Sequence, residues 1–381
     1  MLTVDRAKLA EWLSWLVQIP SVNPAHVGPR AGMVGEKAVI TAVSQKLREF
    51  GGEVAIEEVY PDRPNLYGIW HGTSDRWVAI DVHVDTVGVE QMTDPPFDGR
   101  VENGRVYGRG SVDTKASLGV ALALLEQMHS GGITPEANVL LCVNVDEEHH
   151  AQGAVALDGW IRRQGLHIDQ LMVAEPTLCV PVYGHKGYSG FHFMVQGKAA
   201  HSSQPHLGIN AITGAAHIVL AIAEENERLQ SLPPSTELGG ATITAVLING
   251  GNGMNVVPDS CTVSVSRRNV PGEDVAQIEA DVEKLVRESC PLPVTMDAPL
   301  GVPAYYQPAD SPWIQQLAAW SGNAPNVVPY GTNALMYQPN LADEIVVFGP
   351  GSIDQAHGAV EWVEIAELAK LAEIYGRWWG V

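Results

Sequence analysis

Four short apolar runs in this chain each lead into polar residues of catalytic type. They are WVAIDVHVD at 77–85, NVLLCVNVDEE at 138–148, LMVAE at 171–175, and EIVVF at 344–348, which continues through GPGSIDQA to His357. Nearly continuous β-branched and aliphatic runs separated by helical stretches are typical of a mostly parallel sheet covered by helices. We therefore predict an α/β domain with ligands bound where the strands end, since such sheets bind ligands at their carboxyl ends.

Helical spacing appears between these runs. Residues 115–128 predict one helix, and an amphipathic helix near the start ends before Pro20. The apolar face of that first helix comprises Leu9, Trp12, Leu13, Leu16 and Val17.

The middle of the chain has a different pattern. It predicts strands at 188–196, 241–249, 256–266 and 293–297, with helices after Gly208 to about Arg228 and after Pro271. The order β-α-β-β-α-β is the split ferredoxin-like arrangement. We predict that residues 183–297 form an inserted α+β domain between two segments of the sheet domain, 1–182 and 298–381.

Composition and charge narrow the function classes. The chain has 381 residues, 45% hydrophobic and 18% charged, which indicates a globular protein of more than one domain. Its formal net charge of −21 argues against nucleic acid or an anionic membrane as partner. Asp5, Arg6, Lys8 and Glu11 interrupt any apolar signal segment, and no run of about 18 uncharged apolar residues predicts a membrane span.

The four cysteines lie far apart, without a C-x-x-C pair. This spacing suggests neither a zinc knuckle nor a disulfide framework. We therefore expect a protein of the reducing cytoplasm.

Asp81, His83 and Asp85 occupy alternate positions of the first run, so they share one side if the chain stays extended. Each acid or histidine, taken alone, is well explained as a hydrogen-bonded core group. That explanation fails for the set, because all its members fall at or just after predicted strand ends or in the following loops. The set is His83, Asp113, Glu147, Glu148, Glu175 and His357.

Several carboxylates gathered at one edge would repel one another unless a cation neutralised them. Two imidazoles with three or four carboxylates suit zinc, and the surplus of ligands suggests two ions that share a carboxylate. Asp113 is the candidate bridge, with a helix N-cap as its alternative role. Of the adjacent acids Glu147 and Glu148, one can bind metal while the other transfers protons; the alternative is an exposed acidic turn.

Competing motifs are weak. GRGSVD lacks the third glycine of a dinucleotide-binding loop, and no P-loop, G-x-S-x-G elbow or H-E-x-x-H helix is present. We expect His149 and His150, which follow the acidic pair, to be solvated or outside the ligand set.

Five ordered motifs, HVDTV, GRGSVDTKAS, VDEE, AEPT and GPGSIDQAH, together with the inserted domain, resemble the dinuclear zinc aminoacylase/carboxypeptidase family. The tail is most similar to the acetylornithine deacetylase branch. The resemblance implies a zinc-exopeptidase-like fold and two zinc ions, with cobalt or manganese as substitutes. It assigns His83, Asp113 and Glu175 to one ion, and Asp113, Glu148 and His357 to the other.

The same resemblance makes Glu147 the general base and Asp85 the residue that orients His83. In the inserted domain, His201 would hold the substrate carbonyl oxygen, often from a neighbouring subunit, or else be a loop-surface histidine. Asn255 and Arg268 would bind the substrate carboxylate. Asn333 departs from the branch, which commonly has an acid there, and this puts recognition of a cationic ornithine side chain in doubt.

The resemblance implies hydrolysis of an N-acyl-L-amino acid in which Glu147 takes the proton of the attacking water and passes it to the leaving amine. A carboxypeptidase or dipeptidase of the same family is the alternative, a succinyl-diaminopimelate desuccinylase is a further one, and a non-catalytic binding protein on this scaffold is the third reading. The exposed edges of the inserted sheet predict a homodimer formed through that domain.

Overall fold

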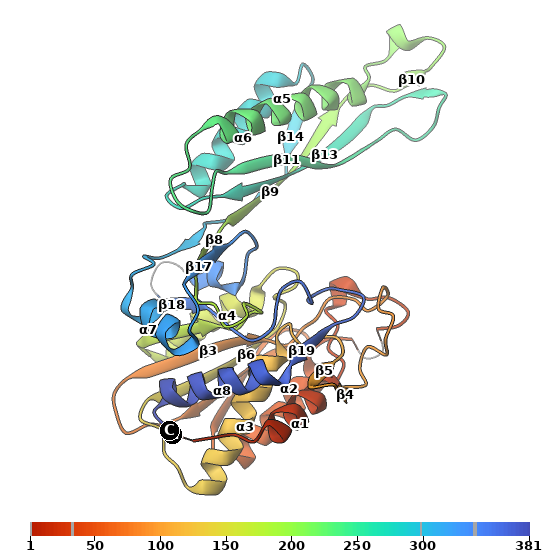
Figure 1. The fold of residues 1–381 in the computed structure, drawn as a ribbon. Coiled ribbons are helices and arrows are strands. Elements are labelled where there is room, and N and C mark those ends of the chain that lie inside the picture. Colours follow the sequence, from red (N-terminus) through yellow and green to blue (C-terminus); the bar gives the residue numbers. More distant parts are fainter. Residues whose placement is uncertain (1, 32–33, 298, 338–340) are drawn as a thin grey trace. The chain divides into compact units, whose positions relative to one another are not determined.

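The computed structural model describes residues 2–31, 34–297, 299–337 and 341–381. The chain forms two compact units (Figure 1). Unit 1 comprises Met1–Tyr183, Gln307–Asn326 and Thr332–Val381, and unit 2 comprises Gly184–Tyr306 and Val327–Gly331.

Unit 1 is built on a mixed sheet with a parallel centre. Its strands follow the order β1-β2-β6-β3-β7-β18, where β6, β3, β7 and β18 are parallel and β1 and β2 run antiparallel at the edge. The bounds are β1 Glu53–Tyr60, β2 Arg63–Trp70, β3 Trp77–His83, β6 Asn138–Asn144, β7 Ile168–Val173 and β18 Ala342–Val347. The prediction of a mostly parallel sheet is confirmed for the strands that carry the candidate site.

Helices cover this sheet. α3 packs on β3 and contacts α1 and α8, while α2 contacts β1 and β2, and α4 packs on β2 and β6. The bounds are α1 Arg6–Val17, α2 Lys37–Glu49, α3 Lys115–Gly131, α4 Gln152–Gln164, α7 Pro312–Ser321 and α8 Ile365–Trp379. The apolar face predicted for the first helix is buried in α1, and the pair Trp378 and Trp379 is buried in α8.

Unit 2 has an antiparallel sheet in the order β11-β13-β9-β14, with β15 also paired to β9. Burial alternates along β9 and β13 because one sheet face packs on α5 and α6. The bounds are β9 Gly187–Gln196, α5 Ala211–Ser231, β11 Thr242–Gly250, β13 Ser260–Asn269, α6 Val275–Ser289, β14 Val294–Met296 and β15 Leu300–Val302. This is the ferredoxin-like order predicted for the insertion.

The strand predicted at 256–266 is wrong in one respect, because it is two strands. β12 covers Val256–Val257 and pairs with β10, Ala200–His201, whereas β13 starts at Ser260. Pro258 lies between them, and proline has no N–H to donate to a ladder. The small β10-β12 ribbon that results carries His201.

No helix in the described part of the chain is long and apolar enough to cross a membrane.

Candidate metal centre

The parallel strands of unit 1 bring the candidate ligands to one edge. β3 ends at His83, β7 ends two residues before Glu175, and β6 ends shortly before the Glu147–Glu148 pair. β18 leads into the loop that contains His357. Parallel strands end at the same edge of a sheet, which explains why His83 and His357, 274 positions apart in sequence, meet here.

Asp113 is the centre of this cluster. Its Oδ1 lies 3.1 Å from Nε2 of His83, and its Oδ2 lies 3.1 Å from Nε2 of His357. The helix N-cap alternative for Asp113 is not what the structure shows, because Thr114 is the N-cap residue of α3. One carboxylate thus faces two imidazoles, one with each oxygen, as a carboxylate shared by two metal ions must.

Two groups of potential metal ligands share Asp113. His83, Asp113 and Glu175 form the first, and Asp113, Glu148 and His357 form the second; within each group the ligand atoms lie within 4.8 Å of one another. His83 Nε2 is 4.0 Å from Glu175 Oε1, and His357 Nε2 is 3.1 Å from Glu148 Oε1. A further group, His167, Asp169 and Asp343, is largely exposed and lies near the amino ends of β7 and β18.

The donor set fits a pair of divalent cations. Nitrogen and carboxylate donors in groups of three suit zinc with a position left open for water or substrate. The fit of zinc rests on these donors and on their electrostatics.

The electrostatics of the cluster favour a cation. Burial raises the pKa of Glu175 well above its usual range, and the neighbouring carboxylates Glu147 and Asp113 raise it further. Hydrogen bonds to Asp113 and Glu148 raise the pKa of His357 to about 10. Without a metal ion, Glu175 and His357 therefore retain protons, and a bound cation would displace these protons.

Glu147 differs from the ligands. It belongs to neither ligand group, and no hydrogen bond to its carboxylate is found among the described residues. Burial raises the pKa of Glu147 to about 8, with Glu148, Asp113 and Asp85 adding to the effect against the opposing charge of His83. A partly buried carboxylate with free oxygens next to the ligands can accept a proton from water.

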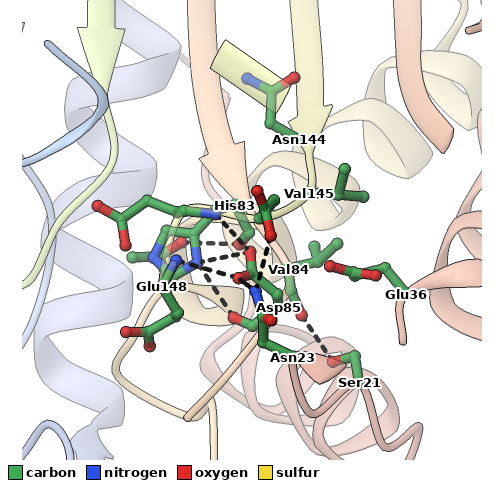
Figure 2. A network of polar contacts seen from close by, with 12 residues as sticks. Ser21, Asn23, Glu36, His83, Val84, Asp85, Asn144, Val145 and Glu148 are labelled. Atoms are coloured by element: carbon green, nitrogen blue, oxygen red, sulfur yellow. Dashed lines mark hydrogen bonds and ion pairs between the residues drawn. The ribbon is translucent and has the colours of Figure 1, made fainter. Parts of the chain in front are cut away.

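Asp85 accepts hydrogen bonds from His83 and from the turn that contains Glu147 and Glu148. Nδ1 of His83 donates to the backbone oxygen of Asp85 at 3.1 Å, which leaves Nε2 with its lone pair towards Asp113 when the ring is neutral. The Asp85 carboxylate accepts the backbone N–H groups of Glu147 and Glu148, each at 3.1 Å. Figure 2 shows His83, Glu148 and Asp85 in this network.

His201 and Asn255 meet on the β10-β12 ribbon of unit 2. His201 pairs with Val256, the residue after Asn255, and Ser202 N–H donates to the Asn255 oxygen at 2.9 Å. Nδ1 of His201 accepts the Ser203 N–H at 3.1 Å. The neutral ring therefore carries its proton on Nε2, and this exposed N–H is a donor that suits a carbonyl oxygen.

Arg268 lies at the other end of β13 from this ribbon. It pairs with Tyr188, whereas Ser260, which follows β12 closely, pairs with Gln196. At about 3.3 Å per residue the two ends are roughly 25 Å apart, so within one copy of unit 2 Arg268 and Asn255 do not meet at one small carboxylate.

Arg268 is exposed and lies over the Tyr188 ring at 5.5 Å, without an ion-pair partner among the described residues. The adjacent Arg267 is buried and binds Glu273 with both Nη atoms. Sequence reasoning missed Lys186, whose pKa is lowered by burial and lowered further by the nearby charge of Arg268. Adjacent residues of a strand face opposite sides, so the sequence pair Arg267–Arg268 predicts one buried and one exposed arginine. The position of Lys186 could not be predicted in this way.

Other supporting residues were also missed. Glu361 accepts the backbone N–H groups of Val112 and Asp113 at 3.0 and 3.3 Å and receives Arg109 Nη1 at 2.6 Å. Asn333 is buried and donates to Asp81 at 3.5 Å, next to Tyr337, which donates to the same carboxylate at 2.6 Å. Asn333 is thus a buried core residue that contacts Asp81 of β3.

His149 and His150 are exposed and lie outside both ligand groups, with ring centroids 3.6 Å apart.

The comparisons with known proteins place these features in a family. Residues 79–380 match the model of peptidase family M20/M25/M40, so the chain belongs to that family. It is a metallohydrolase that acts on linear amides.

Two curated relatives cover most of the chain. It is 29% identical over 347 residues to the acetylornithine deacetylase of Myxococcus xanthus, covering 88% of this chain and 87% of that protein. It is 26% identical over 368 residues to a probable succinyl-diaminopimelate desuccinylase of Staphylococcus epidermidis, covering 86% and 89%.

The fold agrees with that of an M20 family metallo-carboxypeptidase from Sulfolobus solfataricus. The TM-score is 0.75 at 17% identity, with 96% of this chain and 97% of the other covered. This likeness supports the predicted fold class of a zinc-exopeptidase-like sheet domain with an inserted α+β domain.

Proposed function

We propose that this protein is a dinuclear zinc deacylase that hydrolyses the amide bond of an N-acyl-L-amino acid. The observation that carries the proposal is the Asp113 carboxylate shared between His83 and His357, with Glu147 beside it and free of ligand contacts. Curated relatives named as acetylornithine deacetylases support the choice of substrate class.

The residues divide the chemistry among themselves. His83, Asp113 and Glu175 would hold one zinc ion, and Asp113, Glu148 and His357 the other; the ions would acidify water and polarise the scissile carbonyl. Glu147 accepts the proton from the attacking water and delivers it to the leaving amine. His201 Nε2–H donates to the developing oxyanion, and Arg268 binds the free carboxylate of the amino acid in a bidentate contact.

Unit 2 contains both His201 and Arg268, and we assign it the role of a lid and dimerisation domain. Because Arg268 and the His201 ribbon lie at opposite ends of β13, one active site needs them from two copies of the chain. β11 offers a suitable contact, since it is an edge strand of its sheet with three exposed apolar residues. These residues are Val246, Leu247 and Ile248.

Subunit complementation tests this arrangement. His201→Ala and Glu147→Gln chains, each inactive alone, should regain about a quarter of wild-type activity after mixing and subunit exchange, because half the dimers are mixed and each has one intact site. A Leu247→Asp variant should be monomeric and inactive, while Val155→Asp, which changes an exposed residue of unit 1, should stay dimeric. A fully active Leu247→Asp monomer would refute the shared site.

A carboxypeptidase or dipeptidase activity is the second candidate, favoured by the likeness to the Sulfolobus solfataricus metallo-carboxypeptidase fold. Both candidate activities would use the same metal centre. They differ in the chemical group that lies on the acyl side of the scissile amide bond. The buried Asn333 gives no anionic partner for an ornithine ammonium group. We therefore expect neutral N-acyl-L-amino acids to be better substrates than N-acetyl-L-ornithine.

A substrate panel decides between the candidates. Enzyme loaded with zinc or cobalt would be assayed with N-acetyl-L-amino acids, N-succinyl-L-amino acids and dipeptides, with kcat/KM measured for each. The deacylase assignment predicts the highest value for an N-acetyl compound. A dipeptide that exceeds every N-acyl amino acid would assign the protein to the peptidases instead.

All four cysteines are buried and unpaired, which agrees with a reducing cytoplasmic location.

A further inference from the structure

The segment Ser21–His26 lies against residues 84–86, which follow β3. Ser21 Oγ donates to the Val84 oxygen at 2.6 Å, and the Thr86 N–H donates to the Ser21 oxygen at 3.1 Å. The Asn23 N–H in turn donates to the Thr86 oxygen at 2.9 Å. This segment, which we call the brace, is therefore fixed by hydrogen bonds to backbone groups on both sides of Asp85.

Asn23 is the centre of the brace. Its Nδ2 donates to Oδ2 of Asp85 at 2.8 Å and to Oδ1 of Asp146 at 3.2 Å, and its Oδ1 accepts the Ala25 N–H at 3.0 Å. The side chain is fully buried, as are both carboxylates. Figure 2 shows Asn23 and Ser21 beside Asp85 and Val84. An amide suits this position because it gives each of two buried anions a donor without adding charge.

The brace also reaches the other side of the acidic turn. Nε2 of His26 donates to the backbone oxygen of Glu148 at 2.9 Å. The turn at Asp146, Glu147 and Glu148 is thus held at three points: the Asp146 carboxylate, the N–H groups bound by Asp85, and the Glu148 oxygen.

We propose that Asn23, supported by His26, is a positioning residue that fixes the Glu147–Glu148 turn so that Glu148 faces the second metal position and Glu147 faces the attacking water. The roles of these two acids rest on the proposed function. The brace precedes residue 79, where the match to the family model begins.

Glu147 and Glu148 are adjacent acids with different proposed tasks. They keep separate orientations only if the backbone between them is fixed, and Asp85 fixes it by accepting both N–H groups. Asp85 Oδ2 receives Asn23 as well as Glu148, so removal of the amide frees the carboxylate to rotate away from the turn. Loss of such an outer contact costs about 10- to 100-fold in metal affinity or activity in other metal sites.

Zinc affinity tests the proposal without a substrate. Chelator-treated wild type and Asn23→Ala would be titrated with Zn²⁺ in competition with a chromophoric chelator, and the visible spectrum would be recorded with Co²⁺. We expect the second equivalent of Zn²⁺ to bind Asn23→Ala about 10- to 100-fold more weakly, with an altered Co²⁺ spectrum. If the wild-type protein binds two zinc ions but hydrolyses none of the panel substrates, the proposed function is wrong. The comparison of zinc affinities still tests the role of Asn23.

Two further variants keep the test decisive. Asn138→Ala is the matched control, because Asn138 is also buried and its side chain bonds backbone groups at the opposite end of β6. It should lose thermal stability but keep both zinc affinities. If Asn23→Ala does not fold, His26→Ala, at a half-buried position, should show the same weakened second site. Wild-type zinc affinities and Co²⁺ spectrum in folded Asn23→Ala, or in His26→Ala where only that variant folds, would overturn the proposal.

Discussion

His83 Nε2 lies 3.1 Å from Oδ1 of Asp113, the residue whose other carboxylate oxygen faces His357. This contact joins a strand end to the start of α3 and makes Asp113 common to both ligand groups. The proposed dinuclear centre rests on this shared carboxylate.

Replacement of Asp113 by alanine should therefore abolish binding of both ions and all activity, because each position loses one of its three protein ligands. Metal analysis of the purified variant measures this. Asp354→Ala is the control, since that exposed carboxylate lies in the same loop as His357 and belongs to neither group. Two zinc ions retained in Asp113→Ala would be incompatible with the bridge.

Glu147→Gln should keep both zinc ions and lose at least about 10²-fold in kcat, since glutamine matches the shape of glutamate but cannot accept the proton. Glu148→Gln should instead lose zinc from one position. Parallel measurement of metal content and kcat separates the base from the ligand. Near-normal kcat in Glu147→Gln would remove Glu147 from the mechanism.

The stability of metal-free protein should depend on pH through Glu147. Burial raises its pKa from 4.5 to about 8, so between these values the folded protein keeps a proton that the unfolded chain has released. The Glu147 contribution to the free energy of unfolding therefore falls as the pH rises from about 4.5 to 8. Glu147→Gln lacks this contribution.

Thermal midpoints of both proteins in chelator measure the difference. The midpoint of Glu147→Gln should rise relative to that of wild type between pH 5 and pH 8. A difference that stays constant over this range would show that Glu147 ionises normally.

Arg268→Ala should mainly raise KM for substrates with a free carboxylate, whereas His201→Ala should mainly lower kcat, because an oxyanion contact strengthens in the transition state. Steady-state kinetics on the best substrate of the panel measures both. Arg287→Ala is a suitable control, because Arg287 is a surface residue paired with Glu283 on α6. Wild-type kinetics in both Arg268→Ala and His201→Ala would exclude unit 2 from the reaction.

The sequence was most informative where an apolar run leads directly into candidate metal ligands. Apolar runs that end in His83, Glu175 or the Glu147–Glu148 pair predicted both the strands and the edge where they meet. The division of strand 256–266 at Pro258 was missed, although proline marks such breaks. The predicted strand 256–266 already separates Asn255 from Arg268 by its whole length, so their distance could have been inferred from the sequence pattern.

The supporting contacts were less accessible to sequence reasoning. Asn23, Glu361 and His26 act through bonds to residues 60 to 250 positions away, and no periodicity records such pairs. The segment that contains Asn23 was read only as the end of a helix and the proline that follows. Its contacts with Asp85 and Asp146 exist only in the folded chain.

The most direct test is a titration of chelator-treated protein with Zn²⁺ while release of the free amino acid from an N-acetyl-L-amino acid is followed. We expect no hydrolysis without metal, two bound zinc ions per chain at saturation, and activity that follows their binding. Undiminished hydrolysis in the metal-free protein, or a failure to bind zinc at all, would contradict this expectation.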